Sequence, residues 1–517
     1  MGDILRSFLQ PIPLYACSLG GLALLLLILQ AFSALSRRRH YWPVWLVRPV
    51  VYLYQTVAFY LLKHILYPRL FWRRSRSWVI LQVVYWAGTI ICTFIKTHTV
   101  ASICTRAANL AVLNFIPLLI SSRLYLAADL LGLPFRSYVH VHGTFGLMAC
   151  AQGILHMALA IRQRGWSPGN PAQLYGAIAL SAFSLSILVL LLRRCLYEVF
   201  IKIHYLLAIL ALVATWRHVR LQGQRLFSQV YLLIGSCLFA TLTILNWILL
   251  FLRNVTHSRF GSPAQIRRGK GSRIAHITIP ITRPFKPHAG MTVYICMPGL
   301  SAFSIFYTHP FTILWWETNE QGKASSISLL IEKKDGFTKN LLKHRSRELL
   351  TWVDGPYGQQ IDLTRYRNIL MISSGIGIAA QIPYIRELLD LQPKQIYVVW
   401  EVENIDSLDW VYEWMDKLLV QDESSYILRF ALYIGSEESG PRPPEVWNSM
   451  HERIWRHSGE IDYWNVANGF WEQPGESLVT VSAEKHTREK ITKVVQSRME
   501  GVIDIVELAF QPSNRSR

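Results

Sequence analysis

Two apolar segments between residues 139 and 219 each carry a pair of histidines, and these pairs constrain the fold more than any other feature of the sequence. One segment holds His142 and His156, and the other holds His204 and His218, so the separation is fourteen residues in both. Fourteen residues of α-helix advance about 21 Å and turn through about 1400°, close to four full turns. Each pair therefore lies on one face of its helix, with one histidine near each side of a bilayer.

An imidazole in hydrocarbon is costly, so an ionisable residue inside a membrane normally faces the bundle interior and serves a function. Axial ligation of haem iron explains all four histidines, because neutral imidazole is a good iron ligand and two neighbouring helices would hold two stacked haems. His142 would pair with His204, and His156 with His218. The alternative is that these histidines only form hydrogen bonds between helices. However, with 16 histidines among 517 residues, chance gives fewer than one pair at any fixed separation.

The composition fits a membrane protein with a sizeable water-soluble part, since 51% of the residues are hydrophobic and only 17% are charged. A formal net charge of +20 is also compatible with nucleic-acid binding. The basic residues, however, gather in short runs beside apolar spans, at 37–39, 69–76 and 193–194, as the positive-inside rule describes. We therefore expect a lipid bilayer as partner and no nucleic acid. The seven scattered cysteines show no CxxC spacing and indicate neither a zinc site nor a disulfide framework.

The apolar spans predict one leading helix and a core of six. The leading run, about residues 14–35, is too long for the core of a signal peptide and precedes a basic cluster, so we expect it to be retained. The aromatic segment 37–78 is expected at the membrane interface. The six core spans are expected at about 78–95, 107–127, 139–160, 174–192, 201–219 and 230–252. With the basic runs inside, residues 253–517 are expected in the cytoplasm, and His156 and His218 near the outer face.

After residue 253 the pattern changes to short strand-like runs and then to alternating strands and helices. Runs at 274–280, 292–297, 311–317 and 326–332 predict a small antiparallel barrel. From Asn368 a strand, a glycine turn, a helix and a second strand predict an α/β domain. The predicted domains are an N-terminal helix with an interfacial segment (1–77), a transmembrane haem domain (78–252), a flavin barrel (253–366) and a nucleotide-binding domain (367–517).

Two motifs of the soluble half suggest cofactor sites. The segment His309-Pro310-Phe311-Thr312 begins a barrel strand, where backbone groups and a hydroxyl can meet a flavin and its pyrophosphate; alone, it is equally compatible with a structural role. The segments Gly355-Pro356-Tyr357-Gly358 and Ser374-Gly375-Ile376-Gly377 supply glycines that let the backbone approach a phosphate at a helix N-terminus. The second segment falls short of the full G-x-G-x-x-G pattern.

In this order, the paired histidines, His-Pro-Phe-Thr, Gly-Pro-Tyr-Gly and the glycine turn resemble the fungal ferric reductase family within the NADPH oxidase superfamily, over about residues 78–510. The resemblance implies two b-type haems on the four histidines. It implies FAD on His309, Pro310, Phe311 and Thr312. It also implies NADPH on Gly355, Pro356, Tyr357, Gly358, Ser374, Gly375 and Gly377.

The chain departs from the family pattern beside the expected nicotinamide site. Ser482-Ala483-Glu484 stands where the family has Cys-Gly-Pro, and the family's Gly-Arg-Pro segment appears only as Ser458-Gly459-Glu460. The resemblance implies that Ser482 lies beside the nicotinamide. Because a hydroxyl packs differently from a polarisable thiol, we expect hydride transfer to be slow. The preference for NADPH over NADH is left open by the same departures.

The sequence thus predicts a multi-pass membrane protein: a bundle of about seven spans with a six-helix haem-binding core, followed by a ferredoxin-reductase-like pair of a β-barrel FAD domain and an α/β nucleotide-binding domain. Its predicted function is a plasma-membrane metalloreductase that passes electrons from cytosolic NADPH through FAD and two b-type haems to extracellular ferric or cupric chelates, supporting iron uptake. No residue is assigned as acid or base. The alternatives are a superoxide-generating NADPH oxidase and a haem protein with an impaired dehydrogenase half. The chelate and the oligomeric state are left open.

Overall fold

The computed structural model divides the chain into two compact units, residues 1–246 and 247–517. The described residues are 10–37, 69–71, 74–120, 124–223, 226–256, 260–268, 273–300, 304, 308–334, 336–358, 360–402, 405–434, 452–471, 474–497, 503–508 and 510. Most of the predicted interfacial segment, 37–78, therefore lies outside the described residues. Its described part includes two short paired strands, β1 (Arg69–Phe71) and β2 (Arg74–Ser75).

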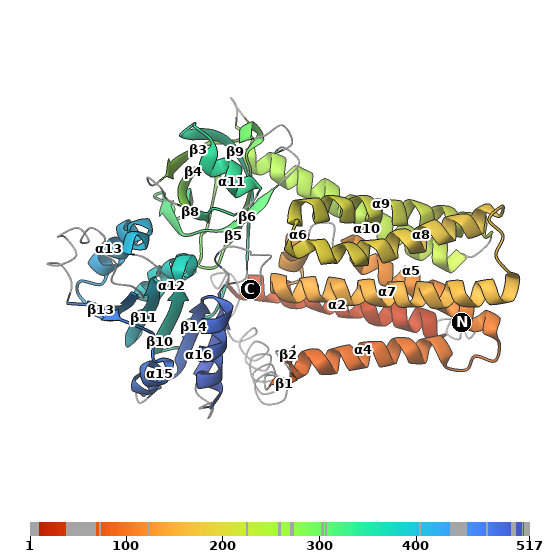
Figure 1. Ribbon diagram of the computed structural model, residues 1–517, viewed down its shortest axis with the longest axis horizontal. Coiled ribbons are helices and arrows are strands. Elements are labelled where there is room, and N and C mark those ends of the chain that lie inside the picture. The colour runs from red at the N-terminus through yellow and green to blue at the C-terminus, as the bar shows by residue number, and fades with distance from the viewer. Residues whose placement is uncertain are drawn as a thin grey trace. The chain divides into compact units, whose positions relative to one another are not determined.

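The first unit is a bundle of long antiparallel helices (Figure 1). The helices are α2 (Pro11–Arg37), α4 (Arg76–Phe94), α5 (Val100–Ile120), α6 (Leu124–Leu130), α7 (Phe135–Arg164), α8 (Pro171–Leu188), the 3₁₀ helix η3 (Val189–Arg194), α9 (Tyr197–Leu221) and α10 (Leu226–Asn254). Six of the described helices are long and apolar enough to cross a membrane, and the apolar part of α4, Trp78–Phe94, is shorter. The predicted span 78–95 therefore corresponds to α4, whose apolar part is shorter than the six candidate membrane spans.

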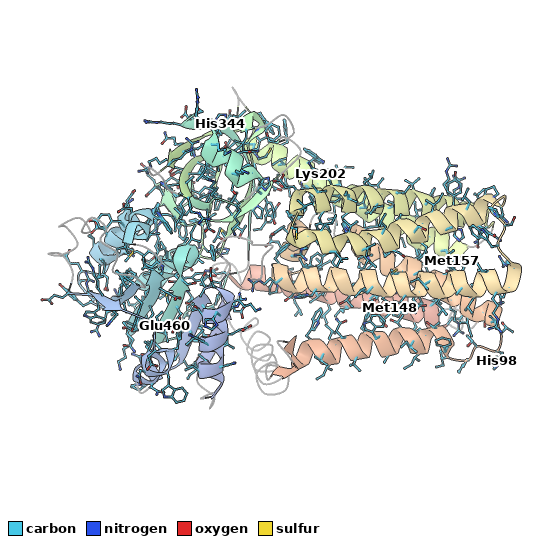
Figure 2. The ribbon with its side chains drawn as sticks, viewed as in Figure 1. His98, Met148, Met157, Lys202, His344 and Glu460 are labelled. Atoms are coloured by element: carbon cyan, nitrogen blue, oxygen red, sulfur yellow. The ribbon has the colours of Figure 1, made fainter. Side chains whose placement is uncertain are left out.

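Helix pairs α5–α7 and α8–α9 pack along one another. Val112 and Phe115 of α5 and Phe200 and Leu207 of α9 contribute to one buried apolar cluster. Helix α8 begins where the sequence signals it, because the Asn170 side chain accepts hydrogen bonds from the first helical N–H groups and a proline follows it. Lys202 at the start of α9 and His98, between α4 and α5, lie at opposite ends of the bundle (Figure 2).

One predicted span was misplaced. Residues 107–127 were expected to cross the membrane, whereas helix α5 begins at Val100 and ends at Ile120. The structure places the charged residue Arg106 inside this helix. In the structure its guanidinium donates to the carbonyl oxygens of Cys92 and Ile95 at the end of α4, so the charge is satisfied inside the helical hairpin.

The second unit begins with a seven-stranded antiparallel sheet in the order β6-β5-β9-β3-β4-β8-β7. Its strands are β3 (Ser262–Arg268), β4 (Ile274–Phe285), β5 (Thr292–Cys296), β6 (His309–Thr312), β7 (Trp315–Thr318), β8 (Ala324–Glu332) and β9 (Glu348–Tyr357), with helix α11 (Phe337–Lys343) packed beside them. Alternating residues such as Ile277, Ile279 and Val293 fill one apolar core.

The single strand predicted at 311–317 is two strands. β6 pairs with β5, and β7 pairs with β8. Between them, the N–H of Ile313 bonds to the Met291 carbonyl and the N–H of Leu314 to that of Ser328, so the chain changes partner at these two residues. The apolar composition of residues 311–317 does not show where the chain changes its partner strand.

The remaining residues form a six-stranded parallel sheet in the order β13-β12-β11-β10-β14-β15, with helices on both faces. Its elements are β10 (Asn368–Ser374), the 3₁₀ turn η6 (Gly375–Gly377), α12 (Ile378–Leu391), β11 (Gln395–Val402), η7 (Ile405–Trp410), α13 (Tyr412–Gln421), β12 (Leu428–Ile434), β13 (Ile454–Ser458), α15 (Tyr463–Trp471), β14 (Ser477–Ser482), α16 (Lys485–Ser497) and β15 (Ile503–Glu507). Successive residues of β10 point to opposite apolar cores, as a doubly wound sheet requires. The predicted fold class is confirmed.

Candidate haem, flavin and nucleotide sites

The four intramembrane histidines come together as two facing pairs. His142 near the start of α7 faces His204 near the start of α9, with ring centres 6.3 Å apart and ring planes at 65°. His156 and His218, near the other ends of the same helices, have ring centres 6.1 Å apart and planes at 76°. The pairing is the one expected from the fourteen-residue spacing.

These separations fit two imidazoles on one metal ion. A metal–nitrogen bond of about 2 Å, added to about 1 Å from a ring nitrogen to the ring centre, places the centres of two opposed rings about 6 Å apart. Between its histidines, the same face of α7 carries Gly146 and Ala149, four and seven residues after His142. These small side chains leave width for a flat macrocycle. The site therefore fits haem.

Hydrogen bonds orient three of the four rings. Nδ1 of His156 donates to the Cys104 carbonyl at 3.0 Å, and Nδ1 of His218 donates to the Ala172 carbonyl at 2.6 Å. Nδ1 of His204 donates to the Ser186 carbonyl at 3.3 Å. A proton on Nδ1 leaves the lone pair of Nε2 free for a metal, which is the usual arrangement behind a ligating histidine.

Two further ring nitrogens, Nδ1 of His142 and Nε2 of His218, differ from these three. Nδ1 of His142 is buried and has no hydrogen-bond partner among the described residues, and an unpaired buried polar atom calls for an explanation such as a bound group. Nε2 of His218 accepts a hydrogen bond from the Gln222 side-chain amide at 2.9 Å. Because iron would use the same lone pair, the Gln222 side chain has to move aside when haem binds.

The predicted flavin motif lies on β6, at the edge of the barrel sheet. The His309 ring stacks on Phe337 with ring centres 4.1 Å apart, and burial lowers the pKa of His309 to about 4, so the imidazole is neutral at pH 7. Phe311 is buried in the barrel core. Phe311 can therefore reach a flavin only through its backbone, whereas His309 and Pro310 are half-buried.

The Gly-Pro-Tyr-Gly segment ends β9, and two of its residues must be glycine. Gly355 and Gly358 have φ of 122° and 135°, and a Cβ on Gly358 would lie 2.9 Å from the Gly290 carbonyl oxygen. Tyr357 is held by its hydroxyl, which donates to Asp354 at 2.6 Å, and burial raises the pKa of that phenol. The sequence did not single out Asp354.

The last residues of α10 bind the same strand. Arg253 donates to the Asp354 carboxylate at 3.0 Å, and the Asn254 amide exchanges two hydrogen bonds with the backbone of Val353, at 2.8 and 2.7 Å. These contacts, all within the second unit, hold residues 253–254 against the strand that carries Gly-Pro-Tyr-Gly. Both residues were missed, because nothing in their sequence neighbourhood marks a long-range partner.

The glycine turn joins β10 to α12 at the point where the strand order reverses, between β10 and β14. A Cβ on Gly377 would lie 1.9 Å from the Ser482 carbonyl oxygen, so no other residue fits there. Ser373 and Ser482 are partners on the two adjacent strands. Both hydroxyls are buried without a hydrogen-bond partner among the described residues. Ligands of doubly wound sheets bind at this position, which fits a nucleotide.

Two further contacts shape the turn. The indole N–H of Trp400 donates to the Gly375 carbonyl at 2.8 Å, and the backbone N–H of Glu484 donates to the Ser374 hydroxyl at 2.8 Å. The Glu484 side chain is exposed to solvent. Ser482 is the last residue of β14, beside the turn.

Three protein-family models match the chain in the order of its domains. "Ferric reductase like transmembrane component" matches residues 107–215, "FAD-binding domain" matches 270–361, and "Ferric reductase NAD binding domain" matches 366–503. A helical membrane bundle joined to a flavin barrel and a nucleotide-binding sheet is the architecture of a transmembrane oxidoreductase. The chain belongs to the ferric reductase family.

Curated relatives are distant fungal proteins. The chain is 22% identical over 270 residues to ferric/cupric reductase transmembrane component 2 of Saccharomyces cerevisiae, covering 49% of this chain and 35% of that protein. It is 28% identical over 240 residues to ferric/cupric reductase transmembrane component 1 of Candida albicans, covering 44% and 28%. The matched part thus spans about a third of the length of these relatives. A flavohemoglobin from Malassezia yamatoensis aligns over 83% of this chain and 98% of its own, at 12% identity and a TM-score of 0.39.

Proposed function

We propose that this protein moves electrons from cytosolic NADPH through FAD and two b-type haems to ferric or cupric chelates outside the plasma membrane, in support of iron uptake. The observation that carries the proposal is the pair of facing imidazoles at each end of the bundle, 6.3 and 6.1 Å apart. One such pair could hold a single structural haem. Two pairs about 21 Å apart along the helices make a path across the hydrocarbon core.

The side chains bind and orient, and the bound cofactors supply the redox chemistry: hydride acceptance and one-electron transfer by the flavin, and one-electron transfer by the haem irons. The glycine turn and the N-terminus of α12 present backbone N–H groups to a nucleotide pyrophosphate. Neutral His309 and the backbone of β6 line the flavin site. No side chain is required to exchange a proton with a substrate.

The orientation follows from the basic residues. Arg37 ends α2, and Arg193 and Arg194 lie in the turn between α8 and α9, which is at the same end of the bundle. Basic residues favour the cytoplasmic side, so this end faces the cytosol and residues 253–517 follow it there. His156 and His218 then hold the outer haem, from which the chelate is reduced.

The test is NADPH-dependent reduction of haem in isolated membranes, followed anaerobically by the absorbance of the cytochrome. We expect NADPH to reduce the haem to the extent that dithionite does, and added ferric citrate or cupric ions to reoxidise it. The exposed His98 offers a matched control, since His98→Ala lies outside the helices and should change nothing.

Two outcomes would contradict the proposal. Haem that dithionite reduces but NADPH and NADH do not would indicate an impaired dehydrogenase half. Reoxidation by oxygen with release of superoxide, and none by the chelates, would indicate an oxidase.

A further inference from the structure

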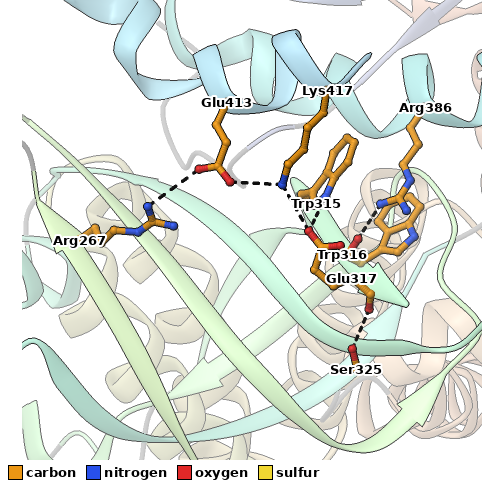
Figure 3. Close-up of polar contacts among 8 residues, drawn as sticks. All are labelled: Arg267, Trp315, Trp316, Glu317, Ser325, Arg386, Glu413 and Lys417. Atoms are coloured by element: carbon orange, nitrogen blue, oxygen red, sulfur yellow. Dashed lines mark hydrogen bonds and ion pairs between the residues drawn. The ribbon is translucent and has the colours of Figure 1, made fainter. Parts of the chain in front are cut away.

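The flavin barrel and the nucleotide-binding sheet meet at an arginine enclosed by two tryptophans (Figure 3). The guanidinium carbon of Arg386, on α12, lies 4.3 Å from the centre of the Trp315 ring and 4.7 Å from that of Trp316, both on β7. Nη1 of Arg386 also donates to the Trp316 carbonyl oxygen at 2.6 Å. Both tryptophans are buried and Arg386 is half-buried, so the cation is partly shielded from water.

Both sides of this contact lead directly to a proposed cofactor site. β7 follows the His-Pro-Phe-Thr strand after only two residues, Ile313 and Leu314. α12 begins at the glycine turn, and Arg386 lies nine residues beyond Gly377. A displacement of α12 against β7 is therefore a displacement of the nucleotide turn against the flavin strand.

The same helix contacts the barrel at a second place. The Glu387 carboxylate accepts a hydrogen bond from the backbone N–H of Ala289 at 2.6 Å. The next residue, Gly290, has no room for a side chain, since its Cβ would lie 2.3 Å from the Tyr384 hydroxyl. One contact point allows two domains to rotate about it in any direction, whereas a second contact elsewhere on the barrel restricts that rotation.

We propose that Arg386 is a positioning residue for hydride transfer, which holds the nucleotide turn at a fixed distance and angle from the flavin strand. This inference rests on the proposed function. Domains of one chain move relative to each other unless their interface is firmly packed, and a misplacement of about 1 Å at the reacting atoms can slow a reaction about a hundredfold. The contacts of Arg386 are with Trp315 and Trp316, so it acts through β7 and α12.

Exposed ion pairs beside the arginine provide an internal control. Lys417 lies 3.5 Å from Glu317 and 3.2 Å from Glu413, and Arg267 lies 3.9 Å from Glu413. The Arg267 side chain is 68% exposed, so water and salt screen its pair. Loss of Arg267 should therefore leave the domain arrangement unchanged, although it bridges the same two domains.

The experiment compares wild type, Arg386→Met, Arg386→Lys and Arg267→Gln as purified full-length protein. Stopped-flow absorbance measures flavin reduction by NADPH and by NADPH deuterated at the transferred position. For Arg386→Met we expect hydride transfer about ten- to a hundredfold slower, a larger isotope effect, a nearly unchanged KM for NADPH, and full FAD and haem content. Arg386→Lys should be intermediate, and Arg267→Gln should match wild type.

A wild-type rate in Arg386→Met would overturn the proposal, and so would a lower rate that only follows loss of FAD. Should neither NADPH nor NADH reduce the wild-type flavin, the proposed function fails, and the inference is then decided by hydrogen exchange. Arg386→Met should speed amide exchange in residues 309–318 and in α12, and unchanged exchange in both would overturn it.

Discussion

Gly176 of α8 lies against the ring of His218, and its replacement by alanine tests how the outer haem is held. A Cβ at this position would lie 2.8 Å from both Nδ1 and Cε1 of His218, nearly 1 Å closer than ordinary contact. The ring cannot simply withdraw, because its Nδ1 donates to the Ala172 carbonyl one turn earlier on the same helix. The ring must tilt, and its Nε2 then no longer points at the position opposite His156.

The expected weakening of outer-haem binding in Gly176→Ala follows from three free-energy contributions. Overpacking costs about 1–3 kcal/mol, and a weakened hydrogen bond costs about 1 kcal/mol more. Alanine stabilises a helix by about 1 kcal/mol relative to glycine, which offsets part of this cost. The net cost of about 1–3 kcal/mol corresponds to outer-haem binding that is about ten- to a hundredfold weaker.

The assay is the ratio of haem to protein in the purified protein, together with a redox titration that resolves the two haems. Gly176→Ala should lose most of the outer haem and keep the inner one. Gly143→Ala is the matched control, because Gly143 is also helical, adjoins His142, and has nothing within 4 Å of an added Cβ. It should keep both haems. Full haem content with unchanged potentials in Gly176→Ala would show that His218 is not held as described or does not bind iron.

Four other outcomes are expected. His156→Ala should remove the outer haem while sparing the inner haem and the flavin, and full haem content with unchanged potentials would contradict the ligand assignment. Protease added outside intact cells should not cleave residues 253–517, and cleavage there would reverse the topology. Ser482→Cys combined with Ala483→Gly should speed flavin reduction, measured by stopped flow. An unchanged rate would show that these departures from the family pattern do not affect hydride transfer. Burial lowers the pKa of His309 to about 4, so barrel stability in urea should fall as pH drops from about 6.5 towards 4, and His309→Gln should flatten that dependence.

Local periodicity predicted those parts of the fold that depend on neighbouring residues. The fourteen-residue spacing placed His142 and His156 on one face of α7 because a helix fixes that angle. The same spacing placed His204 and His218 on one face of α9, and the two faces meet as the pairs His142–His204 and His156–His218. Strands β4, β5, β8, β10 and β11 were also predicted from apolar runs bounded by turn residues, whereas β3 and β9, in the middle of the antiparallel sheet, were missed.

Contacts between distant residues could not be predicted in this way. Arg106 lies inside α5, and the carbonyls that satisfy its charge belong to Cys92 and Ile95 of the preceding segment. Ser373 and Ser482 are 109 positions apart, and only the strand order makes them neighbours. The enclosure of Arg386 by Trp315 and Trp316 likewise depends on how two domains meet, which no local pattern encodes.

The structure also limits what the family pattern implies for residues 482–484. Restoring Cys-Gly-Pro in full would place proline at Glu484, whose N–H donates to the Ser374 hydroxyl at 2.8 Å. Proline has no N–H, so this change would remove a contact that holds the nucleotide turn, whatever the thiol at 482 contributes. The exposed Glu484 carboxylate, in contrast, gives no reason to replace it. The informative substitutions are therefore at Ser482 and Ala483, with Glu484 left in place.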